Sequence, residues 1–162
     1  SAETIGKVGQ EFGELFGRSY ANLLWEDNMD DADIVIVAMG SLAIEAIVAA
    51  DMLREEGHKV GVIGLRAFRP FPKADVVRAL EKSRLVVVFD KNISYGSEGA
   101  TCSEIKSALY GSSINAVIRN FIVGLGGRDV KARELADAIR KSLPLLKTGI
   151  LNAEYPEWIC YI

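Results

Sequence analysis

Short apolar runs rich in β-branched residues alternate with segments of helical periodicity from residue 33 onward, and this alternation restricts the fold more than any other feature of the sequence. The apolar runs cover residues 34–39, 59–65, 85–89 and 114–123, and the helical segments cover residues 42–56, 73–82, 99–110 and 130–142. Continuous apolar strands of this length are typical of parallel sheets buried on both faces, with helices as crossovers. The sequence therefore predicts an α/β fold of three layers, with a mostly parallel sheet of βα units between helices.

The two ends of the chain do not show the alternation of strands and helices, so we divide the sequence into three parts. Residues 1–30 are predicted to form a linker helix and a connection, and residues 31–144 the α/β domain. Residues 145–162 form an apolar, aromatic tail that we expect to pack on the domain or on a partner.

The predicted first helix combines apolar residues at helical spacing with an unusual number of glycines. The apolar positions are Ile5, Val8, Phe12, Leu15 and Phe16, and the glycines are Gly6, Gly9, Gly13 and Gly17. Each glycine costs a helix interior roughly 1 kcal/mol relative to alanine. We therefore expect this helix to need a partner surface.

Composition excludes several classes of function. The 162 residues carry a formal net charge of −3 and no polybasic run, which argues against a nucleic-acid or anionic-membrane binder. No apolar stretch approaches the roughly 18 to 20 residues that span a bilayer, and the first residues do not resemble a signal peptide. We expect a cytoplasmic protein.

The positions of the two cysteines and the single histidine exclude most catalytic and metal-binding sites. Cys102 and Cys160 are far apart and neither belongs to a CxxC motif, so a disulfide scaffold, a structural zinc site and a cysteine-ligated cluster are excluded within this chain. The single histidine, His58, falls at the amino-terminal edge of the predicted sheet, away from the usual ligand edge. The sequence therefore predicts no catalytic, cofactor-binding or metal-ligating residue.

Four loops at the predicted carboxyl edge of the sheet contain the remaining candidate residues. They read MGS (39–41), RAFRPFP (66–72), DKNISYGSEG (90–99) and GLGGRD (124–129). None of them matches a GxGxxG dinucleotide motif after the first strand. Arginine beside aromatic residues is typical of interfaces, and it can also bind a carboxylate or phosphate. The candidate interface or anion contacts are Arg66, Arg69, Tyr95, Ser97 and Arg128.

The GLGGRD loop is assigned structural roles as well. Gly126 and Gly127 are expected to let the backbone turn sharply into a helix that begins near Val130. Asp129 is placed to cap the free N–H groups of that helix, and Arg128 is expected to point from the sheet edge toward a neighbouring domain or subunit.

The same loops resemble a known family when they are taken in order. QEFGELFGRSY (10–20), a strand ending in MGS, GHKVGVIGLRAFRPFP (57–72), FDKN before GSEG, and GLGGRD resemble the carboxyl-terminal part of the α subunit of pyruvate:ferredoxin oxidoreductase. The resemblance covers almost the whole chain and includes the wider family of 2-oxoacid:ferredoxin oxidoreductases. GLGGRD favours the members that use pyruvate or a branched-chain 2-oxoacid.

This resemblance implies a domain similar to the carboxyl-terminal domain of transketolase. It also implies a full enzyme that uses thiamine pyrophosphate with magnesium, iron–sulfur clusters and coenzyme A to oxidise a 2-oxoacid and reduce ferredoxin. The chain itself has no GDG motif with a downstream asparagine and no cluster cysteines. We therefore expect a non-catalytic assembly domain that contacts other domains and subunits.

Alternatives remain open at the level of the sequence. The chain could belong to a 2-oxoisovalerate or another 2-oxoacid:ferredoxin oxidoreductase instead of the pyruvate enzyme. A different class of hypothesis is a free-standing α/β module that binds a nucleotide or an acyl group. A titration of the chain with nucleotides, coenzyme A and thiamine pyrophosphate separates the two classes, because an assembly domain binds none of them tightly.

Overall fold

The computed structural model describes residues 2–148 and 156–159 of the 162-residue chain. Its elements, in chain order, are α1 (Ala2–Phe16), β1 (Leu24–Asp27), β2 (Ile34–Met39), α2 (Ser41–Glu55), β3 (Val60–Leu65), α3 (Lys73–Ala79), β4 (Leu85–Asp90), α4 (Ala100–Leu109), β5 (Val117–Ile122), η1 (Leu125–Gly127), α5 (Ala132–Ser142), α6 (Leu145–Thr148) and β6 (Glu157–Trp158).

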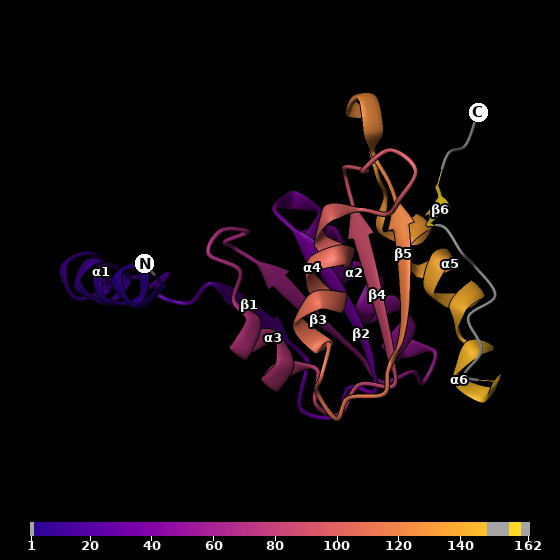
Figure 1. Cartoon of the computed structure of the whole chain (residues 1–162), viewed down its shortest axis with the longest axis horizontal. Coiled ribbons are helices and arrows are strands. Elements are labelled where there is room, and N and C mark those ends of the chain that lie inside the picture. Colours follow the sequence, from indigo (N-terminus) through magenta and orange to yellow (C-terminus); the bar gives the residue numbers. More distant parts are fainter. Residues whose placement is uncertain (1, 149–155, 160–162) are drawn as a thin grey trace.

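The strands form one sheet with the order β1-β3-β2-β4-β5-β6, and the predicted parallel α/β fold is confirmed. Strands β2 to β5 pair in parallel and correspond to the four apolar runs of the sequence (Figure 1). Every residue of β3 and β4 is buried, which explains why these runs lack the alternation of a half-exposed strand.

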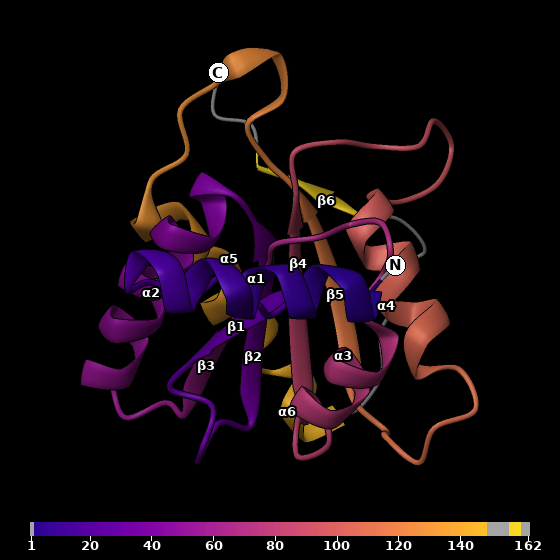
Figure 2. The ribbon, with the colours of Figure 1, turned by 90° about the vertical axis from the view of Figure 1, so that its left-hand side faces the viewer.

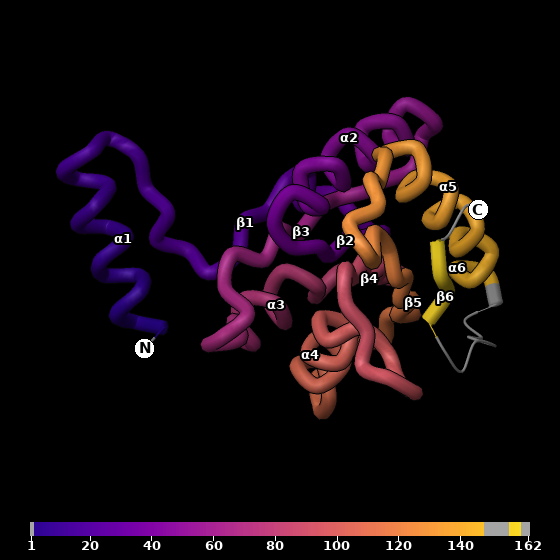
Figure 3. The backbone as a smooth tube through the Cα atoms, turned by 90° about the horizontal axis from the view of Figure 1, so that it is seen from above, coloured from indigo at the N-terminus to yellow at the C-terminus, as the bar shows by residue number. Residues whose placement is uncertain are grey.

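Helices cover both faces of the sheet and enclose two separate apolar cores (Figures 1 and 3). Side chains alternate along a strand, so Ile34 and Ile36 of β2 pack with α2 and α5, whereas Val35 and Val37 pack with α3 and α4. Burial of each such aliphatic side chain contributes about 1.5 to 3 kcal/mol. The three predicted layers therefore follow from strands that are apolar on both sides.

The sheet has one edge strand at each end, and the sequence pattern predicted neither of them. Strand β1 is antiparallel to β3, and its Trp25 lies opposite Gly64, where a Cβ atom would come within 1.9 Å of the indole ring. A side chain at position 64 would therefore displace the tryptophan. Four half-polar residues, Leu24–Asp27, give no strand signal of their own.

The other edge strand, β6, comes from the apolar tail. It pairs in parallel with β5, and Glu157 forms an ion pair with Arg119, a β5 residue whose side chain is only 10% exposed. Ile159 packs against the core on the α2 and α5 side. The described part of the tail therefore packs on this domain, while residues 149–155 and 160–162, including Cys160, lie outside the described residues.

Helix α1 extends from the β1 side of the domain and lies apart from both helical layers (Figures 1 and 3). Seen from that side, it runs across the front of the domain (Figure 2). It ends at Phe16, the last of the apolar positions at helical spacing, and Gly17 follows with a φ of 68°. None of its residues is buried.

Candidate functional site: the carboxyl edge of the sheet

The carboxyl ends of the parallel strands bring the four predicted loops to one edge of the sheet (Figure 1). Ligands in open α/β sheets bind at this edge, where adjacent strands connect in opposite directions. Here that position lies between β2 and β4, because β2 leads through α2 to β3 on one side and β4 leads through α4 to β5 on the other. The Thr101 hydroxyl and Met39 Sδ approach to 3.9 Å across this position.

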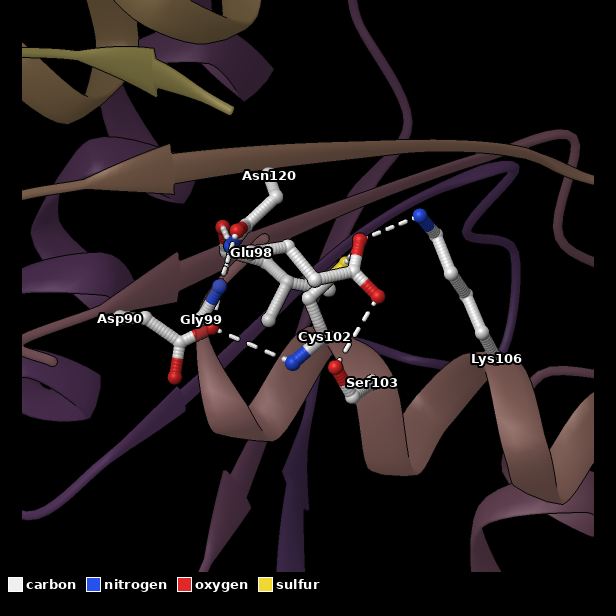
Figure 4. A network of polar contacts seen from close by, with 8 residues as sticks. Asp90, Glu98, Gly99, Cys102, Ser103, Lys106 and Asn120 are labelled. Carbon is white, nitrogen blue, oxygen red and sulfur yellow. Dashed lines mark hydrogen bonds and ion pairs between the residues drawn. The ribbon is translucent and has the colours of Figure 1, made fainter. Parts of the chain in front are cut away.

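The start of α4 is capped by side chains from the strand ends (Figure 4). Asp90, at the end of β4, is 1% exposed and accepts hydrogen bonds from the backbone N–H groups of Thr101 (3.0 Å) and Cys102 (3.2 Å). Asn120 of β5 accepts from the N–H of Gly99 at 2.8 Å, and Asn92 accepts from that of Ala100 at 2.8 Å. We call Asp90, Asn92 and Asn120 the α4 cap.

The members of the α4 cap also bind one another. The Asn120 amide donates to Asp90 at 3.0 Å and to the carbonyl of Val88 at 3.1 Å, and Asn92 donates to Asp90 at 3.3 Å. Gly99 lies so close that a Cβ atom there would be 2.1 Å from an Asp90 oxygen. Helix starts of this kind bind anions when their N–H groups are free, but here an internal carboxylate already occupies the position.

Glu98, just before α4, is the centre of a second polar cluster, whose other members are residues of α4 (Figure 4). Its carboxylate accepts from the Ser103 hydroxyl at 3.0 Å and forms an ion pair with Lys106. The Cys102 thiol contacts the same carboxylate at 3.4 Å, and burial followed by this negative charge raises the pKa of Cys102 well above its usual range. Such a thiol is a packed core group and a poor nucleophile.

Two of the predicted contacts, Tyr95 and Ser97, lie in the loop between β4 and α4. The Tyr95 side chain is fully exposed, and Ser97 is exposed. The N–H of Ser97 donates to the carbonyl of Ser94 at 2.9 Å, which closes a turn through Gly96 with a φ of 72°. This turn holds the aromatic ring away from the domain.

The two arginines of RAFRPFP have different environments. Arg69 forms an ion pair with Glu104 at 2.6 Å and lies over the Phe68 ring at 4.3 Å, so its charge is already paired within the chain. Arg66 is exposed and lies over the Tyr20 ring at 5.5 Å. Arg66 therefore contacts the segment that leads from α1 into β1.

The GLGGRD loop forms the turn expected of it, but not the expected helix cap. Gly126 and Gly127 have φ values of 69° and 83°, which glycine adopts freely. The cap assigned to Asp129 is wrong, because α5 begins at Ala132 and Lys131 is its N-cap residue. Asp129 is exposed and forms an ion pair with Lys131.

Glu134 closes the start of α5 in place of Asp129. Its carboxylate accepts the Lys131 backbone N–H at 2.9 Å and forms an ion pair with Arg128 at 2.6 Å. These donors hold the pKa of Glu134 below its usual value, the backbone hydrogen bond most strongly. The outward orientation predicted for Arg128 is also wrong, because its guanidinium donates to Glu134 and to the carbonyl of Ile159 at 3.2 Å.

A family model for the pyruvate:ferredoxin oxidoreductase core domain II matches residues 32–135, which include the whole parallel sheet from β2 to β5 and its carboxyl-edge loops. The chain belongs to this family. The match agrees with the order of loops that the sequence shares with these enzymes.

Curated relatives of this core domain II chain are subunits of 2-oxoacid oxidoreductases. Ketoisovalerate oxidoreductase subunit VorA of Pyrococcus horikoshii is 40% identical over 96% of this chain and 39% of the relative. Pyruvate synthase subunit PorA of Methanosarcina barkeri is 40% identical over 90% of this chain and 37% of the relative. The chain thus spans about two-fifths of the length of the curated relatives it matches.

Solved structures share the fold of the core domain II chain at lower identity. The 2-oxoglutarate:ferredoxin oxidoreductase from Magnetococcus marinus, with 2-oxoglutarate, coenzyme A and succinyl-CoA bound, has a TM-score of 0.56 and 19% identity over 83% of this chain and 21% of its own. A split-gene transketolase, solved as an inactive tetramer of four β subunits, has a TM-score of 0.57 and 23% identity over 72% of this chain and 41% of its own. Both support the predicted transketolase-like fold.

The start of α4 in core domain II does not fit a bound diphosphate. The N–H groups of α4 that would face a diphosphate are bound by the α4 cap, and the Asp90 carboxylate would repel it. Within residues 2–148 and 156–159, no three metal-ligating side chains gather at one place. None of the helices in the same residues has the length and apolar character needed to cross a membrane.

Proposed function

We propose that this chain is the core domain II portion of the α subunit of a pyruvate:ferredoxin oxidoreductase, and that it serves assembly and not catalysis. In the complete cytoplasmic complex, other domains and subunits hold thiamine pyrophosphate, magnesium, iron–sulfur clusters and coenzyme A. The complex oxidatively decarboxylates pyruvate to acetyl-CoA and reduces ferredoxin.

The observation that carries this proposal is that the chain matches only part of a pyruvate synthase subunit. The match to PorA covers 90% of this chain but only 37% of that subunit. The geometry supports an assembly role, because the donors at the α4 start are satisfied within the domain, whereas Tyr95 and the apolar residues of α1 are exposed. Exposed aromatic and aliphatic side chains are typical anchors of protein interfaces.

A second candidate substrate has its own support. The VorA relatives act, by name, on ketoisovalerate, and one of them is as similar to this chain as the PorA relative is. A branched-chain 2-oxoacid is therefore the alternative to pyruvate. The free-standing ligand-binding module has less support, because the α4 start where an anion would bind is occupied by Asp90.

The test is an assay of the complete complex. The full gene that contains this segment is expressed with its neighbouring subunit genes, and the complex is purified without oxygen. Reduction of ferredoxin or methyl viologen is then measured with coenzyme A and either pyruvate, 2-oxoisovalerate or 2-oxoglutarate. Omission of coenzyme A is the control.

Fastest reduction with pyruvate supports the proposal, and faster reduction with 2-oxoisovalerate replaces it with the branched-chain alternative. Absence of activity with every 2-oxoacid contradicts both. Calorimetric titration of the 162-residue chain with nucleotides, coenzyme A and thiamine pyrophosphate completes the test. Tight binding of any of them would favour a free-standing module.

A further inference from the structure

The glycines of α1 lie on one side of the helix and are used within the chain. At 100° per residue, Gly6, Gly9 and Gly13 form one stripe along the helix. A Cβ atom at Gly9 would lie 2.5 Å from Cα of Ala21, and one at Gly13 would lie 3.0 Å from the side chain of Ser19. The segment after the helix therefore folds back onto the glycine stripe, and residues 2–22 form a unit that we call the arm (Figure 3).

The apolar residues of α1 lie beside the glycine stripe, and most of them are exposed. Val8 is 56% exposed, Leu15 78% and Phe16 63%. The rings of Phe12 and Phe16 are in tilted contact with centroids 4.5 Å apart. A groove lined by Ile5, Val8, Phe12 and Tyr20 is open to solvent. The opposite side of the helix contains Lys7, Gln10, Glu11 and Glu14, all exposed. Apolar patches of this kind mark interaction surfaces in soluble proteins.

The sheet domain of this chain does not cover the apolar face of the arm. Its base is fixed by backbone hydrogen bonds from Arg66 and Ala67 to the carbonyl of Leu23, at 2.9 and 3.0 Å. A cavity of about 630 Å³ lies between the arm and the domain, lined by Ala2 and Ser19 on one side and by Asp75 and Arg78 on the other. The arm is thus held at its base and stands away from the sheet (Figures 1 and 3).

The size of the patch favours an occupant that is covalently linked to the arm. A 15-residue helix is about 22 Å long and about 10 Å wide, so its footprint is on the order of 200 Å². A stable interface between separate chains buries roughly 800 Å² on each partner. A surface within the same polypeptide needs less area, because the link keeps its effective concentration high.

The length of the relatives provides for a surface that is covalently linked to the arm. The match to VorA covers 96% of this chain, so it takes in at least most of the arm, and about three-fifths of that subunit lies outside the match. We propose that the apolar face of the arm docks on an apolar surface of another domain of the same polypeptide. This inference rests on the proposed function, in that it treats the chain as one domain of a longer subunit.

The test uses the complete α subunit in its complex, with Cys160→Ser as background and Cys102 left in place because it is buried. Val8→Cys places a thiol on the apolar face, Leu15→Cys is a second position there, and Glu14→Cys is the matched control on the polar side. None of these residues is buried, so the variants are expected to fold. Each is labelled with a small maleimide and, separately, cross-linked with a benzophenone maleimide.

Labelling at Val8→Cys and Leu15→Cys is expected to be at least about ten-fold slower than at Glu14→Cys, because opening of the docked face must precede reaction. The benzophenone at Val8→Cys should cross-link within one polypeptide, without a change of mass class on a denaturing gel. Peptide mapping should then place the cross-link in a part of the subunit outside this segment.

Equal labelling rates at the three positions would overturn the inference. So would a cross-link to a second copy of the α subunit or to a different subunit. The 2-oxoacid assay is run on the same samples, so that the two proposals are judged separately. An active complex with freely labelled Val8→Cys refutes only the docked arm, whereas an inactive complex with an intrachain cross-link refutes only the enzymatic assignment.

Discussion

The start of α4 and the arm both contain glycines that let segments approach closely, but they differ in which groups they bury and which they leave exposed. At the start of α4, a buried carboxylate and two asparagines satisfy four backbone N–H groups inside the domain. In the arm, glycines bring two backbone segments together while the neighbouring aliphatic and aromatic side chains stay exposed. Each region contains glycines that allow a close approach, but only the first is complete within this chain.

The difference separates residues that stabilise the domain itself from residues that are available to contact a partner surface. Buried polar groups must find partners in the same fold, because each one left unsatisfied costs about 1 to 3 kcal/mol. Exposed apolar groups leave no polar group unsatisfied, so in the proposed docking they stay uncovered until the arm meets its partner surface. Substitutions in the two regions should therefore differ in what they disturb.

The largest effect is expected from Asp90→Ala. It removes the acceptor for two buried backbone N–H groups and for the Asn120 amide, so the free energy of unfolding should fall by about 3 kcal/mol or more. Urea denaturation followed by circular dichroism measures the change. Asp129→Ala is the matched control, and it should leave the transition in place because that carboxylate is exposed and caps no helix. Equal losses for the two variants would contradict the role given to Asp90.

A smaller effect is expected from Gly99→Ala. The added methyl group would lie 2.1 Å from an Asp90 oxygen, and relief of this clash should cost about 1 to 3 kcal/mol. Gly6→Ala in the arm is the matched control, because its nearest neighbour, the carbonyl oxygen of Ala21, is 3.8 Å away. Thermal unfolding should show a lower Tm for the first variant only. A domain that tolerates Gly99→Ala as well as Gly6→Ala would rule out the close packing seen at α4.

Glu134 should give the domain a stability that depends on pH. Its pKa is lowered in the folded state, so its contribution is present above the unfolded-state pKa and is lost as the pH falls through the folded-state pKa. Glu134→Gln should therefore be less stable than the natural chain near neutral pH, and the difference should shrink under acid conditions. Denaturation curves at a series of pH values test this. A difference that grows as the pH falls would have the wrong sign.

The smallest effect on the isolated chain is expected from Val8→Ser and Phe16→Ser. Helix α1 has no buried residue, so each change should alter the free energy of unfolding of the sheet domain by less than about 0.5 kcal/mol. The same urea titrations measure it. A loss as large as that of Gly99→Ala would mean that the arm belongs to the domain core, and it would remove the contrast between the two regions.

The sequence by itself determined the central architecture. The four apolar runs became β2 to β5, and the helices between them lie within about two residues of their expected positions, except that α3 ends three residues early. These features depend on local periodicity, which a fully buried strand and an amphipathic helix carry in their own residues. The loop order was specific enough to indicate the family that the domain match later showed.

Only the tertiary structure decided the polar contacts and the sheet edges. Asp90 and Asn120 are 30 positions apart and meet because β4 and β5 are neighbours, although a polar residue inside an apolar strand was a signal that could have marked Asn120. Arg128 turns inward because Glu134 and the carbonyl of Ile159 lie beside it, and neither partner can be inferred from GLGGRD. Short edge strands and salt bridges have no period of their own, so they are fixed by which segments the fold brings together.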